Sequence, residues 1–307
     1  MFIHFILAPM LRARCGKIIK RRRQFGTSDG VTLQFLSQSL LDVTRTALAL
    51  AFLFYASWSD NETREVSNTV WMVFAPLAFV LTFAEEVYFY HFSQLPLYGI
   101  CFAFTAMFAI LIFYAGGFGG ADAKALMCLA LALPFFPTSL HSPLFGVSPT
   151  QKILFPLSIF SNSVLMAALM TFVMLGYNIV WRIRTGRELF DGNYENGSVG
   201  RKILILITGY KADIQKLKDK WHIYPLEDAN EDSENNLNRK LIAIPKDEGR
   251  DGVVQRLDEA INEGKIQDGV WASPGLPFLI FVTAGLVLAL SVGDIVWICI
   301  SRLLAVI

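Results

Sequence analysis

The sequence predicts an all-α polytopic membrane protein, with six transmembrane helices and a small α+β domain inserted before the last helix. Three observations lead to this fold class. The 307 residues are 54% hydrophobic, with a mean hydropathy of +0.46, which is too apolar for an ordinary soluble domain. The apolar residues come in blocks long enough to cross a bilayer. Most charged residues gather in one polar stretch over about residues 182–267.

A bilayer-spanning helix needs roughly 20 mostly apolar residues. The segments that qualify are Leu40–Trp58, Val70–Phe89, Leu97–Tyr114, Ala123–Leu140, Ile153–Trp181 and Pro277–Ile300. The first contains Asp42 and Arg45, which are three residues apart and are expected to pair on one helix face. Glu85, Glu86 and Asp294 are expected at solvated positions near span ends, because a buried charge there is costly.

The polar stretch before the last segment predicts a small α+β domain in water. Lys202–Ile207 and Lys240–Ile244 are rich in β-branched residues and predict strands. Gly252–Gly264 has apolar residues at near-helical spacing and predicts an amphipathic helix. Glu227–Asn238 is acidic and rich in asparagine and predicts a loop. The expected organisation is a basic arm over 1–39, a membrane domain over 40–181, a cytoplasmic domain over 182–272 and a last span over 273–307.

Basic residues set the expected orientation. Arg182, Arg184 and Arg187 follow the fifth segment, and positive charge beside a span end marks the cytoplasmic side. The polar domain is therefore expected in the cytoplasm. The same count leaves the N terminus outside, although the positive-inside rule would draw in Arg12, Arg14, Lys17, Lys20, Arg21, Arg22 and Arg23. An interfacial amphipathic arm and a later start of translation are both open alternatives.

Two aspartates lie at the ends of predicted spans. Asp60 closes the first span, and Asp122 follows a cluster of glycines and precedes the fourth. Two predicted spans separate them, so both are expected on one face of the membrane whatever the orientation. Two close carboxyl groups share one proton, because like charges do not both ionise cheaply. Such a pair hydrolyses an amide when one member activates water and the other protonates the carbonyl oxygen.

The neighbouring residues fit this chemistry. Gly119 and Gly120 allow a tight turn and the close approach of an extended substrate. Each signal alone also has a simpler interpretation. A lone aspartate at a span end is usually solvated or an N-cap, and Lys124 beside it is usually a snorkelling anchor. Arg64 and Glu65 alone would be a loop charge pair. The combination of both aspartates with the correct parity favours an active site.

Other classes of site have little support. The net charge of +1 gives no bias toward nucleic acid. The cysteines and histidines lie far apart, without the spacing of a zinc site or a disulfide framework. They are Cys15, Cys101, Cys128, Cys299, His4, His91, His141 and His222. We therefore expect neither a metal nor a cofactor, and the sequence does not fix the oligomeric state.

Ser59-Asp60 through Thr63-Arg64-Glu65-Val66, followed by Gly119-Gly120-Ala121-Asp122-Ala123-Lys124, resembles the archaeal preflagellin and type IV prepilin peptidases. These are membrane aspartyl proteases of the Gly-x-Gly-Asp type. The resemblance covers about Leu40 to the C terminus, and Trp271–Pro277 is similar to the family's final segment re-entering the membrane. It implies that Asp60 and Asp122 are the catalytic aspartates. The supporting residues that it implies are Gly119, Gly120, Ala121, Lys124, Arg64 and Glu65, with Ala121 in place of the motif's second glycine.

The resemblance also implies a substrate class. Archaellin and type IV pilin precursors carry a short basic leader before an apolar helix, and cleavage is expected at the cytoplasmic face of the cell membrane, without methylation. The acidic residues expected to attract the leader are Glu227, Asp228, Glu231 and Asp232. Two alternatives are an ion- or proton-coupled transporter that uses both aspartates and a non-enzymatic subunit of a pilus machine. Transporters usually place such groups near the bilayer midplane, often with inverted repeats, and neither feature is visible.

Overall fold

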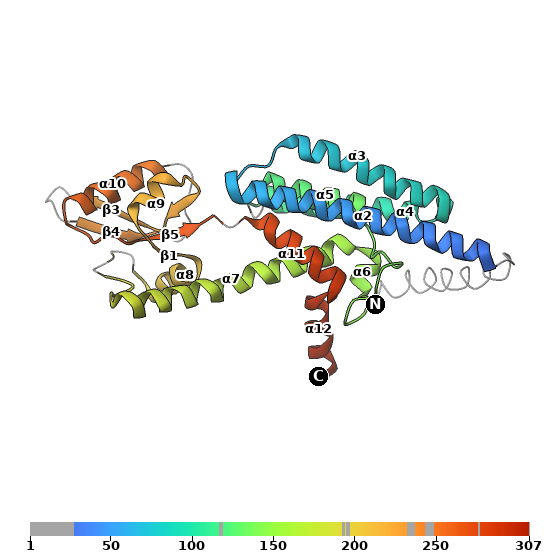
Figure 1. Ribbon diagram of the computed structural model, residues 1–307. Coiled ribbons are helices and arrows are strands. Elements are labelled where there is room, and N and C mark those ends of the chain that lie inside the picture. The colour runs from blue at the N-terminus through green and yellow to red at the C-terminus, as the bar shows by residue number, and fades with distance from the viewer. Residues whose placement is uncertain are drawn as a thin grey trace. The chain divides into compact units, whose positions relative to one another are not determined.

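The computed structural model describes residues 28–116, 119–191, 194, 197–231, 237–242, 249–275 and 277–306. Side chains are described from residue 37 on, except those of Glu231, Leu237 and Val306. The basic residues up to position 27, Gly117 and Asp232 therefore lie outside the described residues. The chain divides into two compact units, and the helix α2 (Ser28–Thr63) belongs to both (Figure 1). Unit 1 is Met1–Phe52, Asn68–Leu157 and Leu290–Gly293, and unit 2 is Leu53–Ser67, Ser158–Ala289 and Asp294–Ile307.

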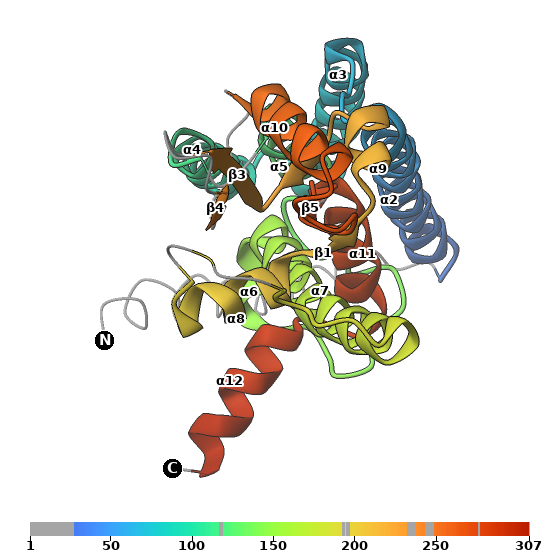
Figure 2. The same ribbon diagram turned by 90° about the vertical axis from the view of Figure 1, so that its left-hand side faces the viewer.

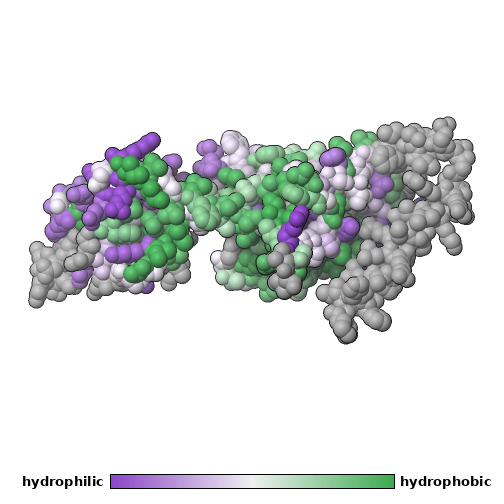
Figure 3. Space-filling view, turned by 90° about the horizontal axis from the view of Figure 1, so that it is seen from below, coloured by the Kyte–Doolittle hydropathy of each residue, from purple (hydrophilic) through white to green (hydrophobic). Residues whose placement is uncertain are grey.

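Among the described residues, four helices are long and apolar enough to cross a membrane. They are Ser37–Thr63 within α2, α3 (Asn68–Glu85) with its π-helical continuation η1 (Glu86–Tyr90), α4 (Leu95–Tyr114) and α7 (Phe155–Thr185). The first, second, third and fifth predicted segments are thus confirmed as long apolar helices. In the space-filling view, hydrophobic residues cover most of the coloured surface, and strongly hydrophilic ones gather over the part of the chain that carries the sheets (Figure 3).

The sixth predicted segment is broken. It consists of α11 (Phe278–Ser291) and α12 (Ile295–Val306), which are bent by 58° at their junction and count as a fifth span if taken together. Gly293 in the break has φ +118°, a left-handed value that glycine adopts without a steric penalty. Asp294 follows it, and the expected solvated position of this aspartate is wrong. Its side chain is buried and accepts hydrogen bonds from Ser158 Oγ (2.8 Å) and the Trp297 backbone N–H (3.0 Å).

The predicted helix over Ala123–Leu140 is wrong beyond its first part. The helix α5 covers only Gly120–Ala132, roughly 20 Å at the α-helical rise, which is shorter than the bilayer core. Pro134 follows closely, and a proline has no N–H to continue the ladder. Its carbonyl instead accepts from the Phe155 backbone N–H at 3.0 Å. The chain after α5 is therefore irregular, but several of its backbone groups are paired with protein, as in the bond from the Phe136 N–H to the Gln151 carbonyl at 2.9 Å.

Unit 1 contains a buried ionic cluster at one end of α3. Arg45 contacts Asp42, as predicted, and also Glu85 at 2.6 Å. Asp42 in turn accepts hydrogen bonds from the backbone and the hydroxyl of Ser139. The expectation that Glu85 and Glu86 are solvated is wrong, because both are buried. The opposite charge of Arg45 offsets the cost of burying its carboxylates, which a lone charge could not do.

In unit 2, α7 and α11 pack very closely at Gly285. A Cβ atom added there would lie 2.6 Å from the Ile159 carbonyl oxygen, 2.9 Å from the Ser163 backbone nitrogen and 2.2 Å from Ser163 Oγ. Two of these are main-chain atoms, which do not move aside cheaply. Small residues allow such close approach between membrane helices.

Gly285→Ala is therefore expected to destabilise the protein by about 1 to 3 kcal/mol, the usual range for overpacking. A matched control is Gly176→Ala in α7, where an added Cβ meets nothing within 4 Å. Thermal unfolding in detergent measures both variants. Equal unfolding temperatures for the two would contradict the close packing of α7 and α11.

The polar insert forms two small sheets. The first has the antiparallel order β1 (Tyr210–Ala212), β5 (Val270–Pro274), β2 (Ile223–Pro225), and the second is the hairpin of β3 (Glu227–Glu231) and β4 (Leu237–Leu241). The helices of the insert are α8 (Val199–Thr208), α9 (Ile214–Asp219) and α10 (Arg250–Asn262), and the short α6 (Pro149–Ile153) precedes α7 (Figure 2). The small α+β character and the helix over Gly252–Gly264 are confirmed.

Three local predictions for the insert are wrong. Lys202–Ile207 is a helix, because Ser198 caps α8 by accepting from the Arg201 N–H, and a six-residue apolar run does not by itself distinguish strand from helix. Glu227–Asn238 contributes to a hairpin rather than a loop. The segment Trp271–Pro277 was expected to re-enter the membrane. It instead supplies most of β5, the central strand of the first sheet, and Trp271 is fully buried. Of the strand predicted over Lys240–Ile244, β4 covers the first two residues, and residues 243–244 lie outside the described ones.

Glu227 explains why an acidic segment forms a strand. Its side chain is fully buried and accepts hydrogen bonds from Tyr194 Oη (2.9 Å), Arg239 Nη2 (2.8 Å) and the Trp271 backbone N–H (2.8 Å). Burial and the neighbouring Glu227 carboxylate raise the pKa of Tyr194. Glu227 is thus a buried structural residue, and the expectation that it attracts a basic leader is wrong. Asp228 is likewise bound, by Arg256 at 2.8 Å.

Candidate active site

Asp122 lies in the first turn of α5. Gly119 is the N-cap of this helix, and its backbone N–H donates to Asp122 Oδ2 at 3.0 Å. A glycine has no side chain to return the bond, so only one half of a capping box is present. A carboxylate at this position also interacts favourably with the positive end of the helix dipole. Asp122 is half-buried, as is Ala121 beside it.

The glycine at position 119 is required by space rather than by backbone torsion. Its φ of −71° suits any residue, but an added Cβ would lie only 3.1 Å from Asp122 Oδ2. At Gly120 an added Cβ would meet Phe113 at an ordinary 3.8 Å. The first glycine therefore sets how the Asp122 carboxylate is held, and the second does not.

Gly119→Ala is accordingly expected to push the Asp122 carboxylate aside by a few tenths of an ångström. If Asp122 acts as a catalytic carboxylate, a shift of this size should lower turnover about tenfold, because misplaced catalytic groups lose rate steeply. Gly120→Ala is the matched control and should retain nearly full turnover. Initial rates of substrate cleavage measure both. If the Gly120→Ala variant cleaved more slowly than the Gly119→Ala variant, the conclusion that Gly119 rather than Gly120 sets the position of the Asp122 carboxylate would be contradicted.

Lys124 connects the Asp122 motif to the segment that follows Asp60. Its Nζ donates to Asn68 Oδ1 at 2.6 Å. Asn68 opens α3 and lies eight positions after Asp60 in the sequence, and Lys124 lies two positions after Asp122. The side chain of Lys124 is exposed and reaches across to the start of α3. Its snorkelling role stays a prediction, but the hydrogen bond gives it a definite partner within unit 1.

Asp60 lies in the last turn of α2, followed by a tight turn. Arg64 has φ +58°, a left-handed conformation that is uncommon without glycine, and its N–H donates to the Asp60 carbonyl at 3.1 Å. The Glu65 carbonyl accepts from the hydroxyls of Ser59 (2.8 Å) and Thr63 (2.9 Å). These bonds hold the turn, while the Glu65 side chain is exposed.

The Asp60 carboxylate faces two groups from unit 2. Its electrostatic partners are the Arg64 guanidinium and the backbone N–H of Leu279, in the first turn of α11. Ser57 Oγ, one turn before Asp60, bonds Thr283 Oγ1 at 2.8 Å and fixes α2 against α11. Sequence analysis missed Leu279, Ser57 and Thr283. No local pattern pairs hydroxyls 226 residues apart within apolar segments.

Arg64 is half-buried, and its Nε makes no hydrogen bond within the described residues. Burial lowers the pKa of Arg64, and the charges of Asp60 and Tyr224 oppose that shift. Burial, together with the positive charges of Arg64, Lys220 and Arg250, also lowers the pKa of His222. Arg64 thus supplies positive charge to a region shared with β2.

The structure brings Asp60 together with Arg64 and brings Asp122 together with Gly119. The two aspartates belong to different compact units, and their pairing stays a prediction. Among the described residues, no group of three or more histidine, cysteine or carboxylate side chains could hold a metal ion.

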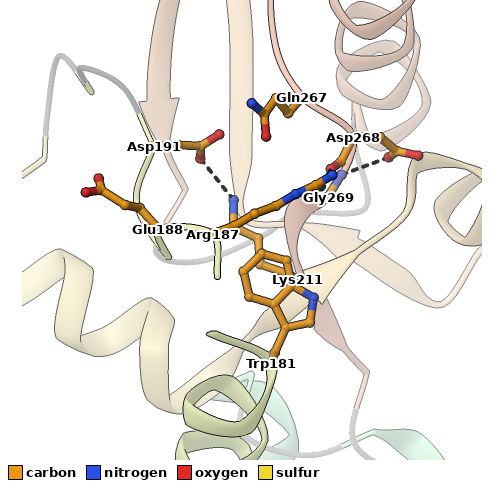
Figure 4. A pocket seen from close by; sticks show the side chains of 8 residues that line it. All are labelled: Trp181, Arg187, Glu188, Asp191, Lys211, Gln267, Asp268 and Gly269. Atoms are coloured by element: carbon orange, nitrogen blue, oxygen red, sulfur yellow. Dashed lines mark hydrogen bonds and ion pairs between the residues drawn. The ribbon is translucent and has the colours of Figure 1, made fainter. Parts of the chain in front are cut away.

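A cavity of about 320 Å³ lies in the insert, at the end of α7 (Figure 4). Its lining contains neither Asp60 nor Asp122. Lys211 Nζ lies 3.4 Å from Asp191 Oδ1, and Arg187 Nη1 donates to the Asp268 carbonyl at 3.2 Å. The other lining residues are Trp181, Glu188, Gln267 and Gly269. This cavity does not replace the aspartates as the candidate active site.

Comparisons with known proteins agree with an apolar helical peptidase. Residues 47–175, which include both aspartates, match the Type IV leader peptidase family, and residues 201–295 match the Archaeal Peptidase A24 C-terminus Type II family. A preflagellin peptidase of Methanococcus maripaludis is 22% identical over 252 residues, covering 79% of this chain and 92% of the relative. A preflagellin peptidase of Methanococcus voltae is 23% identical over 264 residues, covering 81% and 94%.

These matches define the class of the molecule as an aspartic-type peptidase with membrane character. The chain is similar to the type IV leader peptidase family over residues 47–175, and to the archaeal A24 peptidases over residues 201–295.

Proposed function

We propose that the chain is a membrane-embedded aspartyl endopeptidase that removes the short basic leader from archaellin or type IV pilin precursors at the cytoplasmic face of the cell membrane. Asp60 and Asp122 form its catalytic pair. The observation that carries this proposal is the Lys124–Asn68 hydrogen bond. Eight residues span at most roughly 29 Å when fully extended, so Asn68 limits how far Asp60 can lie from the start of α5.

The number of membrane crossings supports the same pairing. Two apolar helices, Asn68–Tyr90 and Leu95–Tyr114, separate the aspartates in the sequence. If both cross the bilayer, the chain returns to the side from which it started, and the two carboxyl groups meet the same aqueous phase.

We propose six crossings in total, the fourth made by α5 with the irregular chain after it. Lys124 contacts Asn68 at the start of α3, while Ser139 contacts Asp42, whose ion-pair partner Arg45 also binds Glu85 at the end of α3. The segment from Lys124 to Ser139 therefore covers the same depth as α3. Irregular backbone is tolerated at membrane depth where it is buried in protein, and the groups of Pro134 and Phe136 are paired in this way. The insert over about residues 182–272 then lies on the cytoplasmic side, where Arg182 and Arg184 end α7.

In the proposed reaction the two carboxyl groups hold one proton between them. The ionised member takes a proton from water as that water attacks the scissile carbonyl carbon. The protonated member donates its proton to the carbonyl oxygen, which gives a tetrahedral intermediate. The carboxyl group that took the proton from water then gives it to the amide nitrogen, while the other carboxylate takes back a hydroxyl proton, and the C–N bond breaks to release the leader and the mature N terminus. Gly119 and Arg64 position Asp122 and Asp60 respectively.

A reconstituted assay tests the proposed function. The purified chain is placed in liposomes with a pilin or archaellin precursor, and the product is identified by mass spectrometry of its new N terminus. We expect a single cut between the basic leader and the apolar helix. A precursor that stays intact in the presence of folded protein would contradict the proposal, and proton flux across the same liposomes would point instead to a transporter.

A further inference from the structure

The helix α8 buries Ile205 in the domain, but it also exposes apolar residues to its surroundings. The apolar residues Val199 (75%), Ile203 (54%) and Leu204 (38%) are exposed. The charged Lys202 turns instead toward the domain, where its Nζ lies 5.5 Å from the centre of the Phe190 ring. A helix in water places its apolar face inward and its charges outward. An apolar surface of this kind on a folded domain marks an interaction site.

The C-terminal end of α8 is attached to α7 (Figures 1 and 2). Asn178 of α7 is fully buried, and its Nδ2 donates to the carbonyl oxygens of Leu206 (2.9 Å) and Gly209 (2.8 Å). The neighbouring Tyr177 packs edge-on against Tyr210, with ring centres 5.8 Å apart. The two hydrogen bonds from Asn178 satisfy the carbonyls of Leu206 and Gly209 at the end of α8, where carbonyls otherwise lack a partner within the helix.

The position of Asn178 along α7 sets the depth of α8. It lies roughly 35 Å along the helix from Phe155, at a rise of about 1.5 Å per residue. The hydrocarbon core of a bilayer is about 30 Å thick, and the headgroup layers bring the total to about 40–45 Å. Asn178 therefore reaches headgroup depth if α7 crosses the membrane. At this level α7 also exposes the apolar residues Val180 and Ile183.

We propose that α8 is an interfacial membrane helix, with Val199, Ile203 and Leu204 inserted at the boundary between headgroups and acyl chains of an anionic bilayer. Arg182 and Arg184 in the last turn of α7 supply positive charge for the lipid phosphates. A helix of this type lies in the plane of the interface and binds through its buried apolar area and its attraction to anionic lipid.

The proposed anchor has a consequence for the insert, because β1 begins directly after α8. At the junction, a Cβ added to Gly209 would lie 2.4 Å from Leu226 Cδ1 and 3.0 Å from the Ala272 carbonyl oxygen. The junction therefore has no spare room, and α8 fixes the first sheet at the membrane surface. This inference needs only a membrane location and does not depend on the peptidase activity.

Site-directed labelling tests the anchor. The four native cysteines (Cys15, Cys101, Cys128 and Cys299) are replaced by alanine, and single cysteines are introduced as Ile203→Cys, Val199→Cys or, as a control, Gln255→Cys. Gln255 is an exposed polar residue of α10 in the same insert. Each variant carries an environment-sensitive fluorophore and is reconstituted into vesicles of phosphatidylcholine and phosphatidylglycerol, with and without bromination of the acyl chains.

We expect blue-shifted emission at positions 203 and 199, the loss of most of that emission in brominated lipid, and protection from aqueous iodide. Position 255 should show the reverse pattern. If positions 203 and 199 behave like position 255, the helix faces water and the anchor is excluded. Protection from both quenchers would also overturn the proposal, because it would place the apolar face against protein.

Discussion

Asp60→Asn and Asp122→Asn, made separately, should each lower the rate of precursor cleavage by about a thousandfold or more, within the range by which general acid–base groups accelerate reactions. Asparagine has nearly the same shape as aspartate, but it neither ionises nor shares a proton. Its side-chain oxygen still accepts a hydrogen bond, so the Gly119 N–H at the start of α5 keeps its partner. The loss should therefore be chemical, with the protein level unchanged.

The matched control for these variants is Glu62→Gln. Glu62 is an exposed carboxylate in the last turn of α2, two residues from Asp60. The Glu62→Gln variant should cleave the precursor at the wild-type rate. The measurement is the initial rate of conversion of a co-expressed precursor, normalised to the amount of membrane protein. Normal cleavage by either aspartate variant would remove that residue from the pair.

Glu227→Ala should destabilise the insert by about 3 to 5 kcal/mol, the cost of leaving a buried charge without its partner. The substitution removes the acceptor for Tyr194, Arg239 and the Trp271 backbone at once. Arg239 is buried, so its charge would lose its main partner in a region with little water. The insert should then unfold at a clearly lower temperature.

The matched control is Asp251→Ala, which also removes a carboxylate bound to an arginine. Asp251 contacts Arg250 at 2.7 Å, but its side chain is 95% exposed, so the pair is expected to contribute no more than about 1 kcal/mol. Thermal unfolding of the full-length protein in detergent compares the two variants. If they melt at the same temperature, the buried network around Glu227 does not stabilise the insert.

Some parts of the molecule follow from local sequence patterns, and others depend on distant contacts. The long apolar runs that form α3 and α4 were predictable, because a bilayer imposes a minimum length on a spanning helix. The end of α5 at Ala132 follows from Pro134. Hydropathy averaged over a window of about 20 residues does not detect the effect of a single proline. The apolar run Lys202–Ile207 is by itself compatible with either a strand or a helix. The cap provided by Ser198 and the contacts with α7 stabilise the helix.

The candidate site shows the same division. The positions of Asp60 and Asp122 at helix ends were predictable from glycine and span patterns, and the structure confirms both placements. The contact of Asp60 with the Leu279 N–H was not, because it joins residues more than 200 positions apart. The sequence analysis assigned Gly119 to a tight turn and to the approach of substrate, and the structure adds a further reason for glycine there. The Asp122 carboxylate occupies the space that a side chain at position 119 would need, while the backbone torsion of Gly119 is an ordinary one.

The central claim is that Asp60 and Asp122 meet on one side of the membrane, and intramolecular cross-linking tests it most directly. Asp60→Cys and Asp122→Cys are combined in the chain that lacks native cysteines, and membranes are treated with an oxidant or a short bismaleimide. A disulfide needs Cα atoms within about 7 Å, and the bismaleimide extends this reach.

A second pair, His91→Cys with Asp122→Cys, serves as the control, because His91 lies in the turn between η1 and α4, one predicted span away from Asp122. Our account predicts that the 60/122 pair is cross-linked within one chain and that the 91/122 pair is not. A 60/122 pair that labels at both cysteines but never cross-links would contradict the shared active site.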